Sequence, residues 1–456
     1  MNPEKLTDVT VIRKTKSRCV ECGKIVDASV LQRQGKIFLE KKCPVHGDMR
    51  VLLSECPQYY KKLDSYFFSV TPDELKRWAM EIDITFRCNM KCPICAWGND
   101  FRQKMSQFPE PTIEEIVNFS KKNKIKTVRL SGGEPTCRDD LVDIVRALKA
   151  INKRVIINTN GVKLHDYDYV SNLYDAGVDT INVTFDGFSR ETEVFLRGDD
   201  YLPYKLKALD NLKTMRIPTG LNIRIMKGMN ENQISKIIDY AVANDHIKLL
   251  SFGTVGWVGN ARNWPDDKYF MPDQLIDAIT QQTGNQIRRE SFYLFQKLFI
   301  AVGSFFNQRW CFYDSASIML LKEKGTYETV DKYIDLRKIE RYLDSYVRLY
   351  KRNIFMAKLY LFFAGILSIR HIRSTRLLKE LMGKGLSFFK KNNRYLKTNS
   401  FIYLNVSTTC DNHKIDYKIT RNCIFGMVFK GKDGILRFRG TGADMCDALN
   451  NGPLPL

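Results

Sequence analysis

The sequence predicts an α/β protein built around an open barrel of parallel strands, a partial (β/α)6 barrel of the TIM type. Two observations predict this fold. Apolar, strand-like runs alternate with helix-like runs from about residue 78 to 285, and such alternation favours parallel strands joined by right-handed crossovers. A cysteine-rich segment precedes this region, and a helix-rich, aromatic and basic segment follows it and turns to short strands near the end. We therefore expect a metal-binding ribbon over residues 1–70, a barrel over 78–285 and a carboxyl-terminal substrate or auxiliary region over 286–456.

The composition indicates a globular, intracellular chain. Its 456 residues are 44% hydrophobic, which suits a large core and excludes a disordered protein. The first residues, MNPEKLTDVT, lack the apolar core of a signal peptide, so we expect a cytoplasmic location. The 12 cysteines then favour metal binding over disulfides. The net charge of +21 permits nucleic acid, anionic lipid or an acidic substrate as a partner, and its sign alone does not choose among them.

Six strand-like runs define the expected barrel. They are Glu81–Thr85, Thr127–Ser131, Arg154–Asn158, Asp179–Phe185, Gly220–Ile225 and Lys248–Phe252. Helix-like runs separate them, and the first begins with Thr112 as N-cap and Glu115 three residues later, the pattern of a capping box. In barrels of parallel strands the chemistry lies at the carboxyl ends of the strands. Functional residues are therefore expected directly after these runs.

Three cysteines follow the first strand directly. The segment FRCNMKCPICAW places Cys88, Cys92 and Cys95 at Cys-x3-Cys-x2-Cys spacing, with Pro93 stiffening the loop. Thiolates are the soft ligands that iron–sulfur clusters require, and three of them leave one iron of a four-iron cluster open for a substrate. The alternative is a zinc site or buried free thiols, but zinc usually takes four ligands and no fourth lies nearby in the sequence.

This spacing resembles the cluster motif of the radical S-adenosylmethionine (SAM) superfamily, and the resemblance covers about residues 79–261. It implies an enzyme with a [4Fe-4S] cluster on these cysteines and with SAM bound to the cluster. The segment SGGEP, after the second strand, resembles the family's glycine-rich motif that binds the SAM amino group; its residues are Gly132, Gly133 and Glu134. Glycines permit close backbone approach there, and both carbonyl oxygens and the Glu134 carboxylate can meet an ammonium.

Four further residues are carried over from the resemblance as SAM contacts. They are Asn160 in NTNG after the third strand, Thr184 and Asp186 in TFDG after the fourth, and Arg197 in FLRG. Arg197 is expected to pair with the SAM carboxylate, and the alternative is a solvated loop arginine. The run IMKGMNEN, residues 225–232, matches the turn that lies near the adenine in the family.

The resemblance also implies the reaction. A reduced cluster passes one electron to the SAM sulfonium, the bond to the 5′ carbon breaks, and methionine and a 5′-deoxyadenosyl radical form. The radical then removes a hydrogen atom from a substrate C–H bond, while the protein orients the substrate and excludes water. We expect a small electron donor, a ferredoxin or a flavodoxin, as a partner.

The amino-terminal cysteines are spaced as in a tetrahedral metal ribbon. Cys19 and Cys22 form one knuckle, and Cys43 opens a second in the run CPVHG. The fourth ligand is either His46, which its Cys-x2-His spacing favours, or Cys56. Structural zinc is the favoured metal; four thiolates would suit a mononuclear, rubredoxin-like iron, and a ribbon without metal is the third alternative.

Together with this ribbon, the cluster motif in the form ITFRCNMKCPICAW resembles the tetraether synthase-like branch of the superfamily. The best understood members of that branch join lipid tails by carbon–carbon bond formation, and their carboxyl-terminal regions carry further clusters. This chain departs from them, because after the barrel only four cysteines remain: Cys311, Cys410, Cys423 and Cys446. Cysteines alone could hold one auxiliary cluster but not two, and buried thiols are the alternative. Cys137, just after SGGEP, faces either the active site or the core.

One apolar run has two interpretations. Residues 354–369, IFMAKLYLFFAGILSI, are too few for a membrane span and include Lys358. The favoured interpretation is an amphipathic helix buried in the protein, and the other is a helix on an anionic membrane surface. The basic residues beside the run are Arg352, Arg370, Arg373 and Arg376.

Three functions remain open. We favour radical modification of an apolar or lipid-like substrate, because the aromatic and basic helices from about residue 292 to 389 suit an apolar channel near an anionic surface. The second is a peptide-modifying or cofactor-building radical SAM enzyme with one auxiliary cluster. The third is a non-catalytic zinc-ribbon protein that binds nucleic acid. The net charge of +21 permits the third, but the cluster and SGGEP motifs in barrel order argue against nucleic acid as the partner.

Overall fold

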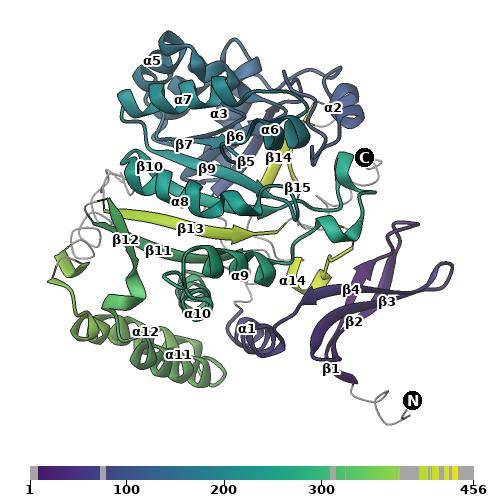
Figure 1. Ribbon diagram of the computed structural model, residues 1–456, viewed down its shortest axis with the longest axis vertical. Helices are drawn as coiled ribbons and strands as arrows, with labels where there is room; N and C mark the ends of the chain where they lie inside the picture. The colour runs from purple at the N-terminus through teal and green to yellow at the C-terminus, as the bar shows by residue number, and fades with distance from the viewer. Residues whose placement is uncertain are drawn as a thin grey trace.

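A computed structural model gives the fold of the chain. It describes residues 9–71, 79–308, 315–323, 325–375, 377–379, 400–408, 411, 413–420, 426–430 and 434–439. The described residues form a large open sheet surrounded by helices and, to one side, a small four-stranded sheet (Figure 1). The α/β fold predicted from the sequence is confirmed.

Six parallel strands form the barrel, and each begins and ends within two residues of the predicted run. They are β5 (Ala79–Thr85), β6 (Thr127–Gly132), β7 (Arg154–Thr159), β8 (Thr180–Thr184), β9 (Thr219–Ile225) and β10 (Ile247–Thr254). They pair in chain order, which places all their carboxyl ends at one edge. Branched aliphatic side chains such as Leu130, Ile157 and Ile181 are fully buried on these strands, as expected where helices and core cover a parallel sheet.

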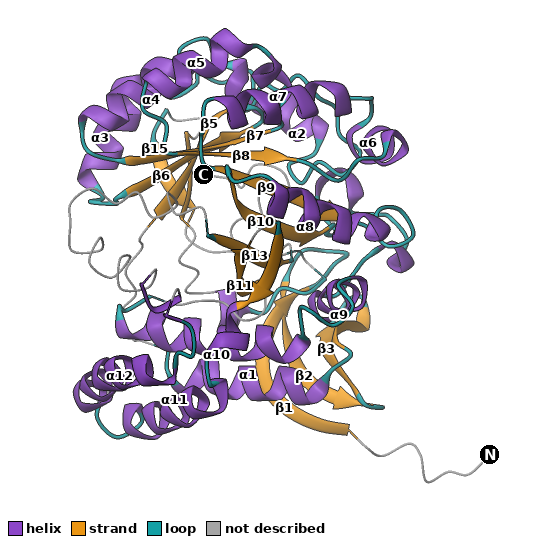
Figure 2. Cartoon of the chain, turned by 60° about the vertical axis from the view of Figure 1, so that its left-hand side comes forward, coloured by secondary structure: helices purple, strands orange, loops and turns teal. Residues whose placement is uncertain are grey.

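Helices cover the outside of the barrel (Figure 2). They are α3 (Ile113–Lys122), α4 (Leu141–Ala150), α5 (Tyr167–Asp175), α6 (Arg190–Arg197), α7 (Leu202–Thr214) and α8 (Ile234–Ala243), and a short α2 (Asn99–Met105) follows the cysteine loop. α3 begins with the predicted capping box, in which Thr112 and Glu115 exchange side-chain to backbone hydrogen bonds. α4 buries Leu141, Ile144 and Leu148 along one face, the spacing that docks an amphipathic helix on a core.

The carboxyl-terminal region extends both edges of the barrel sheet. β13 (Phe401–Ser407) lies parallel to β10, and β14 (Gly426–Lys430) lies parallel to β5. The antiparallel strands β11 (Ser315–Glu323), β12 (Thr326–Thr329) and β15 (Leu436–Arg439) complete an 11-stranded sheet. Its order runs from β12 to β15, so the sheet is open instead of closed on itself. The helix-rich region expected over residues 286–456 therefore also supplies strands to the barrel sheet.

The ribbon and the carboxyl-terminal helices share a second core. The ribbon consists of β1 (Val9–Arg18), β2 (Ile25–Arg33), β3 (Lys36–Cys43) and β4 (Gly47–Ser54), which pair antiparallel in chain order. The helices beside it are α1 (Pro57–Ser69), α9 (Pro272–Gln282), α10 (Arg289–Phe305), α11 (Leu336–Tyr350) and the short α14 (Tyr417–Thr420). Leu39 of β3, Leu63 of α1, Ile300 of α10 and Tyr346 of α11 belong to one buried cluster. An ion pair between Arg13 and Asp416 (2.5 Å) ties the same parts together.

The helix α12 (Ile354–Ser368) lies at the outer edge of the molecule, beyond α11 (Figure 2). Of its residues only Ala357 and Ala364 are buried, while Phe355 is 73% exposed. The prediction of a buried helix is therefore wrong, because α12 meets the rest of the described chain along one narrow side, formed by Ala357, Ala364 and the partly buried Tyr360 and Leu361. Among the described helices, one stretch, Ile354–His371, is long and apolar enough to cross a membrane by length and composition, and 11% of it is buried. Arg376 lies outside the described residues.

Candidate functional site

The three cysteines of the cluster motif lie in the loop after β5, at the carboxyl edge of the parallel strands. All three are partly buried. Backbone hydrogen bonds turn the loop: the N–H of Cys95 donates to the Cys92 carbonyl, and that of Gly98 donates to the Cys95 carbonyl, both at 3.1 Å. Gly198, the left-handed C-cap of α6, packs against this loop, because a Cβ there would lie 3.2 Å from the Lys91 carbonyl oxygen. The motif is thus a compact turn held against α6.

Asn260, in the turn Gly259–Ala261 after β10, fastens this loop. Its Nδ2 donates to the Cys92 carbonyl (2.8 Å), its backbone N–H donates to the Cys95 carbonyl (3.0 Å), and its Oδ1 accepts from the Asn99 N–H (3.1 Å). Gly259 precedes it with φ +54, and a Cβ there would lie 2.1 Å from the Cys95 carbonyl oxygen. Sequence reasoning missed both residues; their signal is the Gly–Asn pair shortly after the sixth strand.

Two buried arginines approach the sulfur atoms. The Arg102 guanidinium donates to the Met90 carbonyl (2.9 Å) and to Asn99 Oδ1 (2.7 Å), and it also hydrogen bonds to Cys95. Burial raises the pKa of the Cys88 and Cys92 thiols, while the charge of Arg102 opposes this at Cys88 and that of Arg197 opposes it at Cys92. Nearby cations favour the thiolate, which is the form that ligates iron.

The donor set fits an iron–sulfur cluster better than a single ion. Among the described residues, the ribbon holds the group of Cys and His ligand atoms that converge closely enough for one metal ion, and the three barrel cysteines do not form such a group. In a four-iron cluster each thiolate binds a different iron, so three ligands around a loop can stand farther apart. The residues that would hold the cluster are Cys88, Cys92 and Cys95.

The SGGEP turn packs directly on the start of the cysteine loop. The N–H of Gly133 donates to the Thr85 carbonyl (2.7 Å), and the N–H of Glu134 donates to the Arg87 carbonyl (2.8 Å). A Cβ on Gly132 would lie 2.0 Å from the Thr85 oxygen, and one on Gly133 would lie 2.3 Å from the Arg87 oxygen. The two glycines are therefore required for backbone packing inside the chain, a role that sequence reasoning did not foresee.

Glu134 is only 2% exposed, and its carboxylate accepts hydrogen bonds from other groups of this chain. Oε1 accepts from the Thr136 N–H (3.1 Å) and from the hydroxyls of Thr136 (2.7 Å) and Thr159 (2.6 Å), while Oε2 accepts from the Asn160 N–H (2.6 Å). Burial raises the pKa of Glu134, and these hydrogen bonds oppose the rise. The carboxylate links the ends of β6 and β7, so the carbonyl oxygens of the turn are better placed than this side chain to meet an ammonium.

Asn160 and Thr184 lie at the ends of β7 and β8 and are partly exposed. The Asn160 Nδ2 donates to Asn89 Oδ1 (2.7 Å), and its Oδ1 accepts from the Val162 N–H (2.9 Å). Because Asn89 follows Cys88 directly, this amide joins the end of β7 to the cysteine loop. Both residues lie at the same edge as the cysteines, as the sequence predicted for parallel strands.

Asp186 and Arg197 form a buried ion pair. Arg197 Nε donates to Asp186 Oδ2 (2.6 Å) and Arg197 Nη2 donates to Oδ1 (3.0 Å), which also accepts from the Arg224 N–H (2.7 Å). Asp186 is fully buried and Arg197 is 9% exposed, so the alternative of a solvated loop arginine is wrong. Two of the Arg197 donors are used inside the chain, and the same guanidinium reaches Cys92. Through this contact with Cys92, the ion pair also holds the cysteine loop.

Of the remaining cysteines outside the ribbon, the described structure places Cys137 near the site. Cys137 is partly buried in the turn after Glu134, and the Asn89 backbone donates a hydrogen bond to it, so it faces the cysteine loop more than the core. Cys311, Cys410, Cys423 and Cys446 lie outside the described residues. The described structure therefore does not test an auxiliary cluster.

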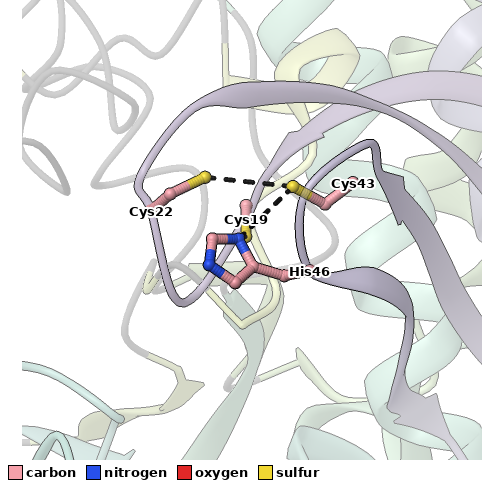
Figure 3. A group of neighbouring side chains, drawn as sticks. All are labelled: Cys19, Cys22, Cys43 and His46. Atoms are coloured by element: carbon pink, nitrogen blue, oxygen red, sulfur yellow. Dashed lines mark hydrogen bonds between the residues drawn. The ribbon is translucent and has the colours of Figure 1, made fainter.

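The ribbon contains a second, separate site (Figure 3). The ligand atoms of Cys19, Cys22, Cys43 and His46 all lie within 4.8 Å of one another. The Sγ atoms of Cys22 and Cys43 are 3.9 Å apart, and His46 Nδ1 lies 3.6 Å from the Sγ atoms of both Cys19 and Cys43. A tetrahedral zinc with ordinary Zn–S and Zn–N bonds needs about 3.8 Å between two sulfurs and about 3.5 Å between sulfur and nitrogen. The donor set and its spacing fit zinc.

Cys56 does not join this site. It is the N-cap residue of α1, and its N–H donates to Ser54 Oγ (3.0 Å) and to Asp273 Oδ2 (3.1 Å). The structure thus brings His46, and not Cys56, to the three ribbon cysteines. Because a histidine occupies the fourth position, the four-thiolate set of a rubredoxin-like iron site is not formed.

Sequence profiles of two families match the chain. The profile of the Radical SAM superfamily matches residues 82–241, from β5 to α8, and that of the HMPTM N-terminal zinc ribbon domain matches residues 11–55. The barrel is a radical SAM domain. The prediction of a radical SAM enzyme with an amino-terminal metal ribbon is thus confirmed at the level of its domains, while the tetraether synthase-like branch stays a prediction.

The alignments with individual relatives cover only part of each relative's length. The chain is 30% identical over 311 residues to the 7,8-dihydro-6-hydroxymethylpterin dimethyltransferase of Methanocaldococcus jannaschii, covering 62% of this chain and 61% of that one. It is 28% identical over 224 residues to a probable GTP 3′,8-cyclase of Pyrococcus abyssi, covering 49% of this chain and 72% of that one. Among solved structures, Streptococcus suis SuiB bound to the precursor peptide SuiA aligns with a TM-score of 0.41 and 18% identity, over 51% of this chain and 50% of that one. The chain spans under two thirds of the methyltransferase.

Proposed function

We propose that the chain binds a [4Fe-4S] cluster and SAM at the carboxyl edge of the barrel and starts radical chemistry there. The observation that carries this proposal is the cysteine loop, where three cysteines follow β5, two buried arginines reach their sulfurs, and Asn260 fastens the loop across the barrel. When bound, the cluster supplies one electron that breaks the sulfonium–C5′ bond of SAM, giving methionine and a 5′-deoxyadenosyl radical that abstracts hydrogen from the substrate.

The chain's own groups bind and orient SAM in this proposal. The backbone carbonyls of residues 131–135 meet the ammonium of SAM, because the Glu134 carboxylate is already hydrogen bonded within the chain. Asn160 and Thr184 offer an amide and a hydroxyl at the same edge for the ribose and the carboxylate. Asp186 and Arg197 keep the cysteine loop in place, and the SAM carboxylate meets Arg197 N–H groups that Asp186 and Cys92 do not use. A small ferredoxin or flavodoxin supplies the electron.

An apolar, lipid-like molecule is the first candidate substrate. The observation that favours it is α12, whose large apolar side chains are exposed on a strongly basic protein, because such a surface suits a chain that works beside lipid. A lipid tail also offers the unactivated C–H bonds that a deoxyadenosyl radical attacks.

A small cofactor precursor of the pterin type is the second candidate. It is favoured by the match of residues 11–55 to the HMPTM zinc ribbon and by the 30% identity to the pterin dimethyltransferase over 311 residues. A heterocycle of this kind needs hydrogen-bond donors and acceptors at the barrel edge, which Asn160 and Thr184 supply at the ends of β7 and β8.

One experiment tests the proposal and separates the substrates. Anaerobically reconstituted protein is incubated with SAM and dithionite, alone, with a lipid extract, or with a dihydropterin, and 5′-deoxyadenosine and product masses are measured. The first candidate predicts that lipid raises 5′-deoxyadenosine release above the substrate-free rate and yields a lipid of altered mass. A rise with the dihydropterin alone would select the second candidate. Absence of 5′-deoxyadenosine in every mixture would contradict the proposed SAM chemistry.

A further inference from the structure

The helices α11 and α12 form an outlying hairpin at one end of the molecule (Figures 1 and 2). The apolar side chains of α12 that are at least 41% exposed are Ile354, Phe355, Met356, Leu359, Phe362, Phe363, Ile366 and Leu367. Lys358 donates to Asn307 Oδ1 (2.6 Å), which places the end of α10, with exposed Val302 and Phe306, beside this helix. Soluble chains rarely expose a contiguous apolar surface of this kind unless it contacts a partner.

The outer face of α11 is basic. Arg337, Arg341 and Arg348 are exposed, and positions four and eleven residues apart lie within about 40° on a helix, so the three form one stripe. The acidic residues of the same helix turn inward, since Glu340 and Asp344 pair with Lys297 of α10 at 3.2 and 2.5 Å. The inward pairing of the acids leaves positive charge on the outside of the hairpin.

Basic residues also lie at both ends of α12. Lys351 and Arg352 precede it, Arg370 and Arg373 follow it, and all four are exposed. The helix contains no acidic residue. With the turn that follows it, the apolar stretch Ile354–His371 has 18 residues and makes about 27 Å, close to the hydrocarbon core of about 30 Å. Length alone would permit a span, but the buried Ala357 and Ala364 and the hydrogen bond from Lys358 to α10 hold the helix along the protein surface. A helix held in this way, with basic residues at both ends, suits the plane of a membrane interface.

We propose that the α11–α12 hairpin docks the protein on an anionic lipid bilayer, with α12 in the boundary between headgroups and acyl chains and the α11 arginines against the headgroups. A second copy of the chain would bring two net charges of +21 together. Nucleic acid would use the arginines but would leave the apolar face of α12 in water. An anionic bilayer meets both features, and this docking does not depend on which molecule is the substrate.

Vesicle co-sedimentation of the full chain tests the proposal, with phosphatidylcholine vesicles that contain either no phosphatidylserine or about one third of it. Two variants remove the two features separately: Arg337→Gln/Arg341→Gln/Arg348→Gln and Phe355→Ser/Phe362→Ser/Phe363→Ser. The matched control is Lys121→Gln/Lys122→Gln/Lys207→Gln, which removes the same charge from exposed positions on α3 and α7 at the barrel. Circular dichroism melting checks that every variant is folded.

The proposal predicts binding to the anionic vesicles that salt weakens, and little binding to neutral ones. Each arginine near an anionic surface contributes roughly fivefold to the partition coefficient, so the arginine variant should lose on the order of 100-fold. The phenylalanine variant should also lose binding, while the lysine control should lose much less. Equal losses in the control and arginine variants, or no vesicle binding at low salt, would overturn the proposal. Sedimentation that shows a dimer broken by the phenylalanine changes would identify a second copy as the occupant instead.

Discussion

Replacing Gly259 by alanine tests whether the loop after β10 sets the geometry of the cysteine loop. An ideal Cβ at Gly259 would lie 2.1 Å from the Cys95 carbonyl oxygen and 2.5 Å from that of Ala96. Both are backbone atoms, so rotation of a side chain cannot relieve the contact. To regain an ordinary non-bonded separation of about 3.5 Å, the cysteine loop must recede by roughly 1.4 Å. Functional groups need placement within about 0.5 Å, so this displacement should weaken cluster binding.

Gly284→Ala is the matched control. Gly284 has φ +57, close to the φ of +54 at Gly259, and nothing lies within 4 Å of a Cβ there. Both variants therefore carry the cost of a left-handed alanine, about 1–2 kcal/mol, which urea unfolding measures. After anaerobic reconstitution we expect wild-type cluster absorption and EPR intensity from Gly284→Ala, and most of both signals lost from Gly259→Ala. Wild-type cluster content in folded Gly259→Ala would refute the reasoning.

Three further predictions concern the ribbon and the pH dependence of stability. Cys19→Ser/Cys22→Ser should lower the unfolding temperature, because metal binding contributes to ribbon folding, yet leave cluster absorption in the soluble protein; loss of the cluster from well-folded variant would contradict this. His46→Ala should lower zinc affinity in a chelator competition, and Cys56→Ala should not; equal affinities would exclude the His46 ligand set. Burial, with Lys213 next, lowers the pKa of His246 to about 4. The unfolded chain, with a pKa of about 6.5, therefore binds the proton first, so stability falls as the pH drops from 6.5 towards 4, by about 2 kcal/mol at pH 5. His246→Gln should remove that part of the difference between urea midpoints at pH 7 and pH 5, and an unchanged difference would count against it.

Local sequence patterns were sufficient to predict the barrel strands and the position of the cysteine loop. Strands such as β6 and β9 are apolar runs bounded by turns, so their limits can be read from neighbouring residues. The parallel order follows from the helices between them. Cys88, Cys92 and Cys95 follow the first run directly, which places them at the functional edge without any knowledge of contacts distant in the chain.

Features that depend on distant contacts could not be predicted in this way. β13 pairs with both β10 and β11, with Tyr403 opposite Leu249 and Met319. A short apolar run contains no local signal that identifies the strands with which it pairs. The fastening of the cysteine loop by Asn260 joins residues 168 positions apart. The sequence left open whether α12 is buried or exposed and favoured burial, because a helix that is apolar on every side has the same pattern in a protein core as beside lipid.

Production of 5′-deoxyadenosine by wild-type protein and by Cys92→Ala tests the central claim most directly. Cys92 lies in the middle of the cysteine loop, its carbonyl is held by Asn260, and Arg197 reaches its sulfur. Without this ligand the loop retains two thiols, too few to hold a four-iron cluster. Anaerobically purified wild-type protein should be brown and, once reduced, should release 5′-deoxyadenosine from SAM, and Cys92→Ala should do neither. SAM cleavage by Cys92→Ala at the wild-type rate would contradict the account.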